Sequence, residues 1–309
     1  MPAARNSRPT APPPTSRACA RAALEAVLRK GRNLADALDG QAGFSAMAGR
    51  ERAFARLLLL TTLRRLGQID HAIDALLEKP LPARRAPVRD ILRLGAAQLL
   101  FLNTPAHAAV DGAVALTAKS RHAALKGLVN ALLRRLARDA VALLANQDAA
   151  RLNTSDWLWQ SWSESYGEET CRAIAAAHLA EPPIDLTVKQ AAPAWMARLG
   201  AEQMPGGTLR LRRAGAPDAL DGYTEGAWWV QDLAAALPAR LLGAVRGQHI
   251  IEIGAAPGGK TAQLAAAGAH VQALDRSPAR LARLRQNLER LSLTAEIIEA
   301  DGETWRPGD

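Results

Sequence analysis

The C-terminal part of the chain, from Gln248 onward, alternates regularly between short apolar runs and amphipathic stretches. The expected strands lie at 249–254, 270–275 and 295–301, and the expected helices between them at 260–268 and 277–291. An order of strand, helix, strand, helix, strand with almost continuously apolar strands is typical of a parallel sheet covered by helices. This part is therefore predicted to be an α/β domain of the doubly wound, Rossmann-like type.

The preceding part of the chain has only helical periodicity. From Ala18 to Arg138, apolar residues recur at spacings of three and four, and proline-containing turns separate the segments. Two more helices and a short mixed αβ stretch follow from about Asn153. The predicted organisation is a disordered Pro/Arg-rich tail at 1–17, an all-α domain at 18–140, linker helices with a small αβ region at 141–235, and the α/β domain at 236–309.

Charge and composition narrow the class of protein. The formal net charge of +9 favours a nucleic-acid partner, although an arginine-rich composition raises the charge whatever the function. The longest apolar run, Leu57 to Leu63, is too short to cross a bilayer. Two distant cysteines fit a reducing cytoplasm, and six histidines without metal-ligand spacing predict no metal site. We therefore expect a cytoplasmic protein without a membrane segment.

The stretch GAAPGGKT at 254–261 fits the phosphate-binding pattern G-x-x-x-x-G-K-[ST] letter by letter. Three neighbouring features argue against a nucleoside triphosphate. Pro257 removes one backbone N–H from the loop, and the carboxylate of Glu252 would repel triphosphate oxygens. Asp275 ends the next strand, where an acidic residue can accept hydrogen bonds from ribose hydroxyls. S-Adenosylmethionine, with an amino group, a ribose and no phosphate, suits these features better, and Asp301 after the third strand could meet its adenine.

Motifs in both halves of the chain resemble one known family. IIEIGAAPGGKT at 250–261, with VQDLAA ahead of it, is similar to the RsmB/NOP family of RNA (cytosine-5) methyltransferases. The segments at 107–119 and 126–138 resemble the NusB-like RNA-binding domain that precedes the catalytic domain in bacterial small-subunit rRNA members. The resemblance implies a class I methyltransferase fold and S-adenosylmethionine-dependent methylation of cytosine C5 in ribosomal RNA.

The resemblance also assigns the cofactor site residue by residue. It implies that the methionine part of the cofactor is held by the loop Gly254, Ala255, Ala256, Pro257, Gly258, Gly259 and Lys260. It assigns the ribose to Asp275 and the adenine to Asp301. Gln231 and Asp232 match the family's VQD segment, where they either support the pocket or cap the following helix. The role of Lys189 stays open.

Catalysis in this family is understood to need a cysteine thiolate that adds to cytosine C6, which makes C5 nucleophilic enough to take the methyl group. The family carries its cysteines in Pro-Cys and Thr-Cys motifs after the third strand of the catalytic sheet. Here Cys19 and Cys171 both precede the cofactor loop, and Cys171, although it follows Thr170, lies on an amphipathic helix. We expect Cys171 to be a small buried residue and the nucleophile to lie beyond Asp309.

Accordingly, we expect an α/β domain that is incomplete after its third core strand, and a chain that is catalytically inert. A sheet ordered third–second–first would leave the outer edge of the first strand unpaired. Two alternatives remain: an RNA-binding antitermination adaptor without catalysis, and a methyltransferase acting on protein or a small molecule. We expect RNA as the partner and a monomeric chain.

Overall fold

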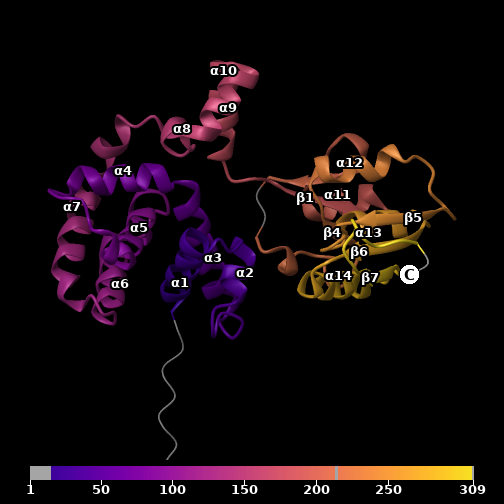
Figure 1. Cartoon of the computed structure of the whole chain (residues 1–309), viewed down its shortest axis with the longest axis horizontal. Coiled ribbons are helices and arrows are strands. Elements are labelled where there is room, and N and C mark those ends of the chain that lie inside the picture. The colour runs from indigo at the N-terminus through magenta and orange to yellow at the C-terminus, as the bar shows by residue number, and fades with distance from the viewer. Residues whose placement is uncertain (1–14, 213–214, 308–309) are drawn as a thin grey trace, which may run out of the picture. The chain divides into compact units, whose positions relative to one another are not determined.

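The computed structural model describes residues 15–212 and 215–307, which form two compact units, Met1–Glu181 and Pro182–Asp309 (Figure 1). This division differs from the predicted boundaries at 140 and 235. The helices expected in the linker group with the N-terminal unit, and the small αβ region groups with the C-terminal unit. Most of the predicted tail at 1–17 lies outside the described residues, and the first helix already begins at Ser16.

Unit 1 is helical throughout its described part, as the periodicity predicts. Its elements are α1 (Ser16–Lys30), α2 (Leu34–Asp39), α3 (Gly49–Arg64), α4 (Leu66–Leu76), η1 (Ala83–Arg85), α5 (Ala86–Leu100), α6 (Ala106–Ala118), η2 (Ala123–Leu125), α7 (Lys126–Ala145), α8 (Ala149–Leu152), α9 (Asp156–Tyr166) and α10 (Glu168–His178).

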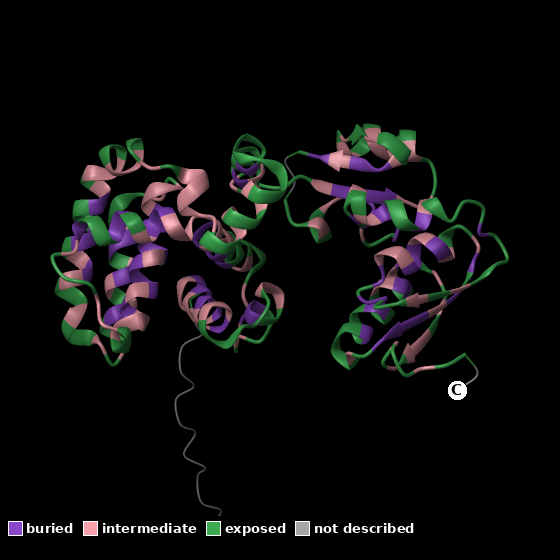
Figure 2. Ribbon diagram, turned by 45° about the horizontal axis from the view of Figure 1, so that its top comes forward, coloured by how far each residue is buried: buried purple, intermediate pink, exposed green. Residues whose placement is uncertain are grey.

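Local signals fix the ends of several helices in unit 1. The Thr15 hydroxyl accepts a hydrogen bond from the amide of Ala18 and caps α1, which ends at Gly31 in a left-handed conformation. Pro105 precedes the first residue of α6, where its missing N–H costs nothing. The core is formed by fully buried aliphatic side chains such as Leu24, Leu58 and Leu133. Figure 2 shows the buried parts of these helices in purple.

An ion-pair network joins α1, α4 and α5 inside this helical core. Asp90 is 0% exposed and accepts hydrogen bonds from Arg29 and, at 3.2 Å, from Arg93. Arg93 also donates to Asp70 at 2.6 and 2.8 Å. Because a buried carboxylate is tolerated only when it is paired, Asp90 depends on both arginines.

Replacing Asp90 with asparagine should lower the free energy of unfolding of unit 1 by about 3 kcal/mol, because two guanidinium groups lose their buried counter-charge. Urea unfolding followed by far-UV circular dichroism measures the change. Asp156→Asn is the matched control, since the Asp156 side chain is 90% exposed and pairs with Arg151 at the surface. The control should change stability by less than about 1 kcal/mol, and equal effects of the two variants would contradict the prediction.

Unit 2 combines two sheets. Its elements are β1 (Ile184–Val188), α11 (Ala192–Leu199), β2 (Glu202–Gln203), η3 (Pro205–Gly207), β3 (Leu209–Leu211), η4 (Pro217–Ala219), β4 (Trp228–Val230), α12 (Leu233–Leu241), β5 (His249–Ile253), α13 (Gly259–Ala266), β6 (His270–Asp275), α14 (Pro278–Leu291) and β7 (Glu296–Glu299). The first four strands form an antiparallel sheet in the order β2-β3-β1-β4, and the last three form a parallel sheet in the order β5-β6-β7.

The parallel sheet confirms the predicted Rossmann-like α/β fold. Its middle strand is the most buried, with Ala273 and Leu274 at 0% exposure, and it packs against Leu281 and Leu284 of α14. The order third–second–first is also as predicted. Parallel strands are ordinarily covered on both faces.

Strand β5 is an edge strand that is not fully covered. Among the described strands it pairs only with β6, and the side chain of Ile253 remains 67% exposed. The carboxyl ends of all three parallel strands lie at one edge of the sheet, where the loops that follow them can form a site.

Candidate functional site

The loop between β5 and α13 is a tight turn held onto the neighbouring strand. The amides of Gly254 and Ala255 both donate to the carbonyl of Leu274 at 2.9 Å, and the amide of Gly258 donates to Ala255 at 2.8 Å. Gly254 and Gly258 have φ angles of 76° and 102°, which favour glycine. The loop is therefore fixed by its own backbone and by β6.

This hydrogen bonding excludes a triphosphate cradle at the loop. A phosphate-binding loop turns successive N–H groups toward its ligand. Here the amides of Gly254, Ala255, Ala256 and Gly258 all have protein acceptors, and Pro257 has no N–H to offer. The donors left for a ligand are those of the first turn of α13, which begins at Gly259 and Lys260.

Asp275 ends β6, as predicted, and lies beneath this loop with only 3% exposure. One carboxylate oxygen accepts from the amide of Ala256 at 3.2 Å, and the other accepts from the amide of Ser277 at 3.0 Å. Arg280 approaches the first oxygen to 3.4 Å and also donates to the carbonyl of Ala256. The carboxylate thus orders the loop, and Arg280 lies beside it.

The side chain of Arg280 is 55% exposed, so it can leave that position without disturbing the core. A carboxylate offers about four lone-pair sites, and the two amides use two of them. Asp275 therefore keeps the capacity to accept from a ligand hydroxyl once Arg280 moves. Sequence reasoning missed Arg280, whose only signal is its place in the first turn of the helix after β6.

Glu252 supplies a second carboxylate, on β5 two residues before Gly254. It accepts a hydrogen bond from the hydroxyl of Thr261 at 2.6 Å. Burial raises the pKa of this carboxyl, while the Thr261 hydrogen bond and the charge of Lys260 lower it in part. A partly desolvated carboxylate at the start of a helix suits a ligand with an ammonium group.

Asp301 supplies the third carboxylate, in the turn that follows β7. It is exposed, and one of its oxygens accepts from the amide of Glu303 at 3.0 Å. The same turn touches β5, because a Cβ added at Gly302 would come within 2.4 Å of the Ile253 side chain. Glu252, Asp275 and Asp301 therefore belong to the same edge of the parallel sheet.

Gln231 and Asp232 have different roles in the structure. Asp232 caps α12 by accepting from the amides of Ala234 and Ala235 at 2.8 and 3.2 Å. Gln231 is 5% exposed and donates to Gln263 on α13 at 2.9 Å. Its side-chain oxygen accepts from a threonine on β1 and a tryptophan on β4. Gln231 thus ties the antiparallel sheet to α13, the helix that follows the loop after β5.

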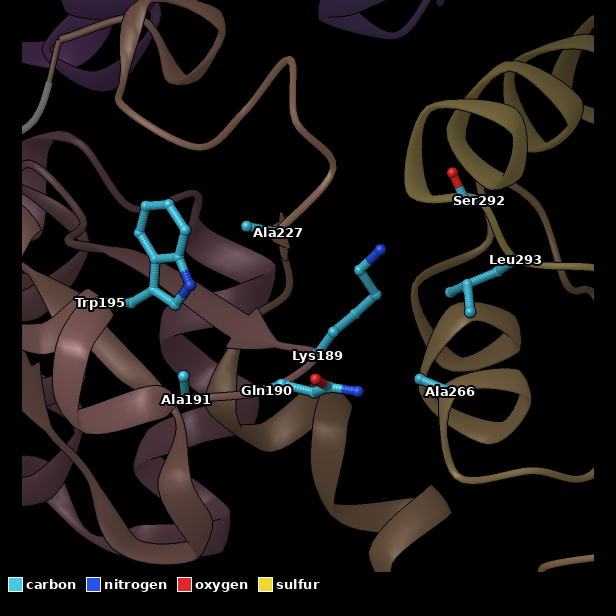
Figure 3. A pocket seen from close by; sticks show the side chains of 8 residues that line it. All are labelled: Lys189, Gln190, Ala191, Trp195, Ala227, Ala266, Ser292 and Leu293. Atoms are coloured by element: carbon cyan, nitrogen blue, oxygen red, sulfur yellow. The ribbon is translucent and has the colours of Figure 1, made fainter.

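Lys189 lies at the other end of the parallel sheet from the loop at 254–260. Its ammonium donates to the carbonyl of Leu291 at 2.6 Å, which places a positive charge at the C-terminal end of α14. It also lines a cavity of about 530 Å³ together with Trp195 and Ser292 (Figure 3). Because Ser292 and Leu293 follow α14, this cavity is at the amino edge of the parallel sheet, away from the predicted site.

The two cysteines are both buried in unit 1. Cys19 is 2% exposed in α1, and Cys171 is 0% exposed in α10, where it contacts the carbonyl of Trp159. The expected buried position of Cys171 is confirmed. Burial raises the pKa of the Cys19 thiol, which disfavours the reactive thiolate.

Two further properties concern only the residues that the structure describes. Within 15–212 and 215–307, no group of three or more His, Cys, Asp or Glu side chains is arranged to hold a metal ion. Over the same ranges, none of the helices has both the length and the apolar character needed to span a bilayer.

The site as a whole offers three carboxylates at the ends of three successive strands, and one helix N-terminus. This set can accept hydrogen bonds from ammonium and hydroxyl groups, but it has no cradle for a polyphosphate. The predicted residues Gly254 to Lys260, Asp275 and Asp301 are brought to one edge. The polar partners that sequence reasoning missed are Thr261, Gln263 and Arg280.

Comparisons with known proteins agree with both halves of this description. The NusB family model matches residues 14–138, and the 16S rRNA methyltransferase RsmB/F model matches residues 239–307. The chain is 36% identical to ribosomal RNA small subunit methyltransferase B of Pseudomonas putida, over 92% of this chain and 68% of that protein. The protein of the same name from Shigella sonnei is 32% identical, over 93% of this chain and 69% of that protein.

A solved structure agrees on the fold. The crystal structure of PH0851 superposes with a TM-score of 0.67 at 18% identity, covering 96% of this chain and 71% of that chain. The names of the sequence relatives favour the rRNA methyltransferase interpretation over the non-catalytic adaptor.

Proposed function

This chain belongs to the 16S rRNA methyltransferase RsmB/F family, and on that premise we propose that unit 2 binds S-adenosylmethionine for methylation of cytosine C5 in small-subunit ribosomal RNA. The observation that carries the proposal is the set of three strand-end carboxylates beside a loop whose amides are already used. The cofactor supplies the electrophilic methyl group when bound. The cytoplasm, where ribosomal RNA is found, is the proposed location.

Each part of the cofactor has a proposed partner among these residues. Gly254, Ala255, Ala256, Pro257, Gly258, Gly259 and Lys260 surround the methionine part, and the Glu252 carboxylate attracts its ammonium group. Asp275 accepts from the ribose hydroxyls after Arg280 has moved aside, and Asp301 accepts from the adenine amino group. Gln231 keeps the start of α13 in place through Gln263. The donor and acceptor types at this edge fit the cofactor.

The pH dependence of binding tests this assignment, because only the ionised form of Glu252 attracts an ammonium group. Its raised pKa means that the neutral acid persists above the ordinary glutamic acid pKa of about 4.3. Cofactor affinity, measured by titration calorimetry, should therefore rise with pH in a window above that value and then level off. Proton linkage predicts the opposite trend for stability, since the folded state binds the proton more tightly and loses stability as pH rises through this window.

Glu252→Gln should flatten the pH dependence of affinity in this window and weaken binding at neutral pH by about tenfold, the equivalent of one lost charge-assisted hydrogen bond. Glu296→Gln is a matched control, since Glu296 is an exposed carboxylate at the opposite end of the sheet. Failure of the unaltered chain to bind the cofactor would overturn the proposal. An unchanged pH profile in Glu252→Gln would remove Glu252 from the site.

A further inference from the structure

The outer face of α7 and the turn before it carry a run of basic residues. Between Gly112 and Arg138 the chain contains no Asp or Glu. The basic residues of this stretch are all exposed and are Lys119, Arg121, Lys126, Arg134, Arg135 and Arg138. We call this set the α7 basic stripe. It lies on the hairpin formed by α6 and α7, which pack side by side (Figure 1).

The stripe is on the side of α7 that the core does not use. The buried face of the helix consists of Val129, Leu132, Leu133 and Leu136. At 100° per residue, Arg134 and Arg138 lie on the opposite side of the helix from this apolar face. Arg134 and Arg138 therefore take no part in the apolar packing of unit 1 and face away from its core.

Most of these charges have no counter-charge. Asp139 is near two of them, at 3.7 Å from Arg135 and 3.0 Å from Arg138. In the described part of the chain, no carboxylate is within ion-pair distance of Lys119, Arg121, Lys126 or Arg134. This differs from the core of the same unit, where aspartates pair with the arginines of α5.

The dimensions of the stripe suit a nucleic-acid backbone. Arg134 and Arg138 are one helical turn apart, about 6 Å, and Lys126 to Arg138 spans about 18 Å at 1.5 Å per residue. Small residues lie between the charges: Ala131 is exposed, and a Cβ added at Gly127 would meet nothing within 4 Å. A phosphate chain can therefore approach the helix closely.

We propose that the α7 basic stripe is a contact surface for the phosphate backbone of the substrate RNA, an inference that rests on the proposed function. Arginine forks match phosphate oxygens in two-point contacts. The face carries no aromatic anchor of a protein interface, and Val141, at 85% exposure, is the one large exposed apolar side chain of α7, fewer than an amphipathic helix uses to enter a membrane. RNA therefore fits this surface better than an acidic protein or a lipid headgroup.

The test compares two triple variants of the full chain that lose the same net charge. The stripe variant is Lys126→Gln, Arg134→Gln and Arg138→Gln, and the control is Lys30→Gln, Arg50→Gln and Arg56→Gln, three exposed positions outside the stripe. Binding of fluorescently labelled, unmodified small-subunit rRNA is measured by anisotropy between about 50 and 200 mM salt. The slope of log affinity against log salt should become shallower by about three for the stripe variant, one for each lost phosphate contact.

Three outcomes would overturn the proposal: an unchanged slope in the stripe variant, an equal loss in the control variant, or no RNA binding by the unaltered chain. If the stripe variant loses binding to vesicles of phosphatidylglycerol as strongly as it loses binding to RNA, the assignment of the stripe to RNA is overturned. Cofactor affinity is measured on the same samples and should be the same in both variants. If the unaltered chain does not bind the cofactor but the stripe variant still shows the shallower salt slope, the result counts against the proposed function alone.

Discussion

Replacing both Cys19 and Cys171 with alanine is expected to leave S-adenosylmethionine binding and any methyl transfer to RNA unchanged. Methylation at cytosine C5 needs a thiolate that can reach C6 of the base. Cys19 and Cys171 are the two cysteines of the sequence, and both are buried among the helices of unit 1. The raised pKa of the Cys19 thiol further lowers the fraction of thiolate. Neither side chain is available as the nucleophile.

Methyl transfer is measured as the incorporation of labelled methyl groups into unmodified small-subunit rRNA. The unaltered chain and the Cys19→Ala, Cys171→Ala double variant should give the same signal, and ribosomal RNA small subunit methyltransferase B of Pseudomonas putida serves as the positive control. Cofactor binding by both forms of the chain, measured by calorimetry, shows that the samples are folded. Turnover by the unaltered chain that the double variant lacks would refute the prediction.

The sequence predicted most of what depends on local pattern. Periodicity distinguished the helical unit from the parallel sheet, and the spacing of Glu252, Gly254 and Asp275 placed the loop and its acidic neighbours at one edge. The division between the units was not predictable in this way, because the antiparallel sheet joins unit 2 through contacts distant in sequence. Gln231 reaches Gln263, and Lys189 reaches Leu291, over gaps that no short-range pattern reveals.

The environment of Asp275 could not be predicted from the sequence either. A carboxylate at the end of the second strand suggested a free acceptor for a ribose, but its oxygens accept from the amides of Ala256 and Ser277 and face Arg280. The motif predicts the residue type because the predicted role, accepting from a ribose, and the observed role, ordering the loop, both need a carboxylate at this position. Only the fold shows that Asp275 orders the loop.

Gly258→Val is expected to weaken cofactor binding by about 10- to 100-fold, the equivalent of roughly 1–3 kcal/mol of backbone strain. Gly258 has a φ of 102°, a conformation that a β-branched residue rarely adopts. A Cβ at this position would lie 3.1 Å from Cγ of Leu284, which is itself 0% exposed. The loop must therefore shift at the point where α13 begins.

Gly243→Val provides the matched control for this substitution. Gly243 also has a positive φ, of 72°, but nothing lies within 4 Å of an added Cβ, and the residue is outside the cofactor loop. Both variants should lose stability in urea unfolding, whereas only Gly258→Val should lose cofactor affinity in calorimetry. Adding Leu284→Ala to Gly258→Val makes room for the side chain but leaves the φ unfavourable, so affinity should recover only in part. Wild-type affinity in Gly258→Val would show that the turn does not shape the cofactor site.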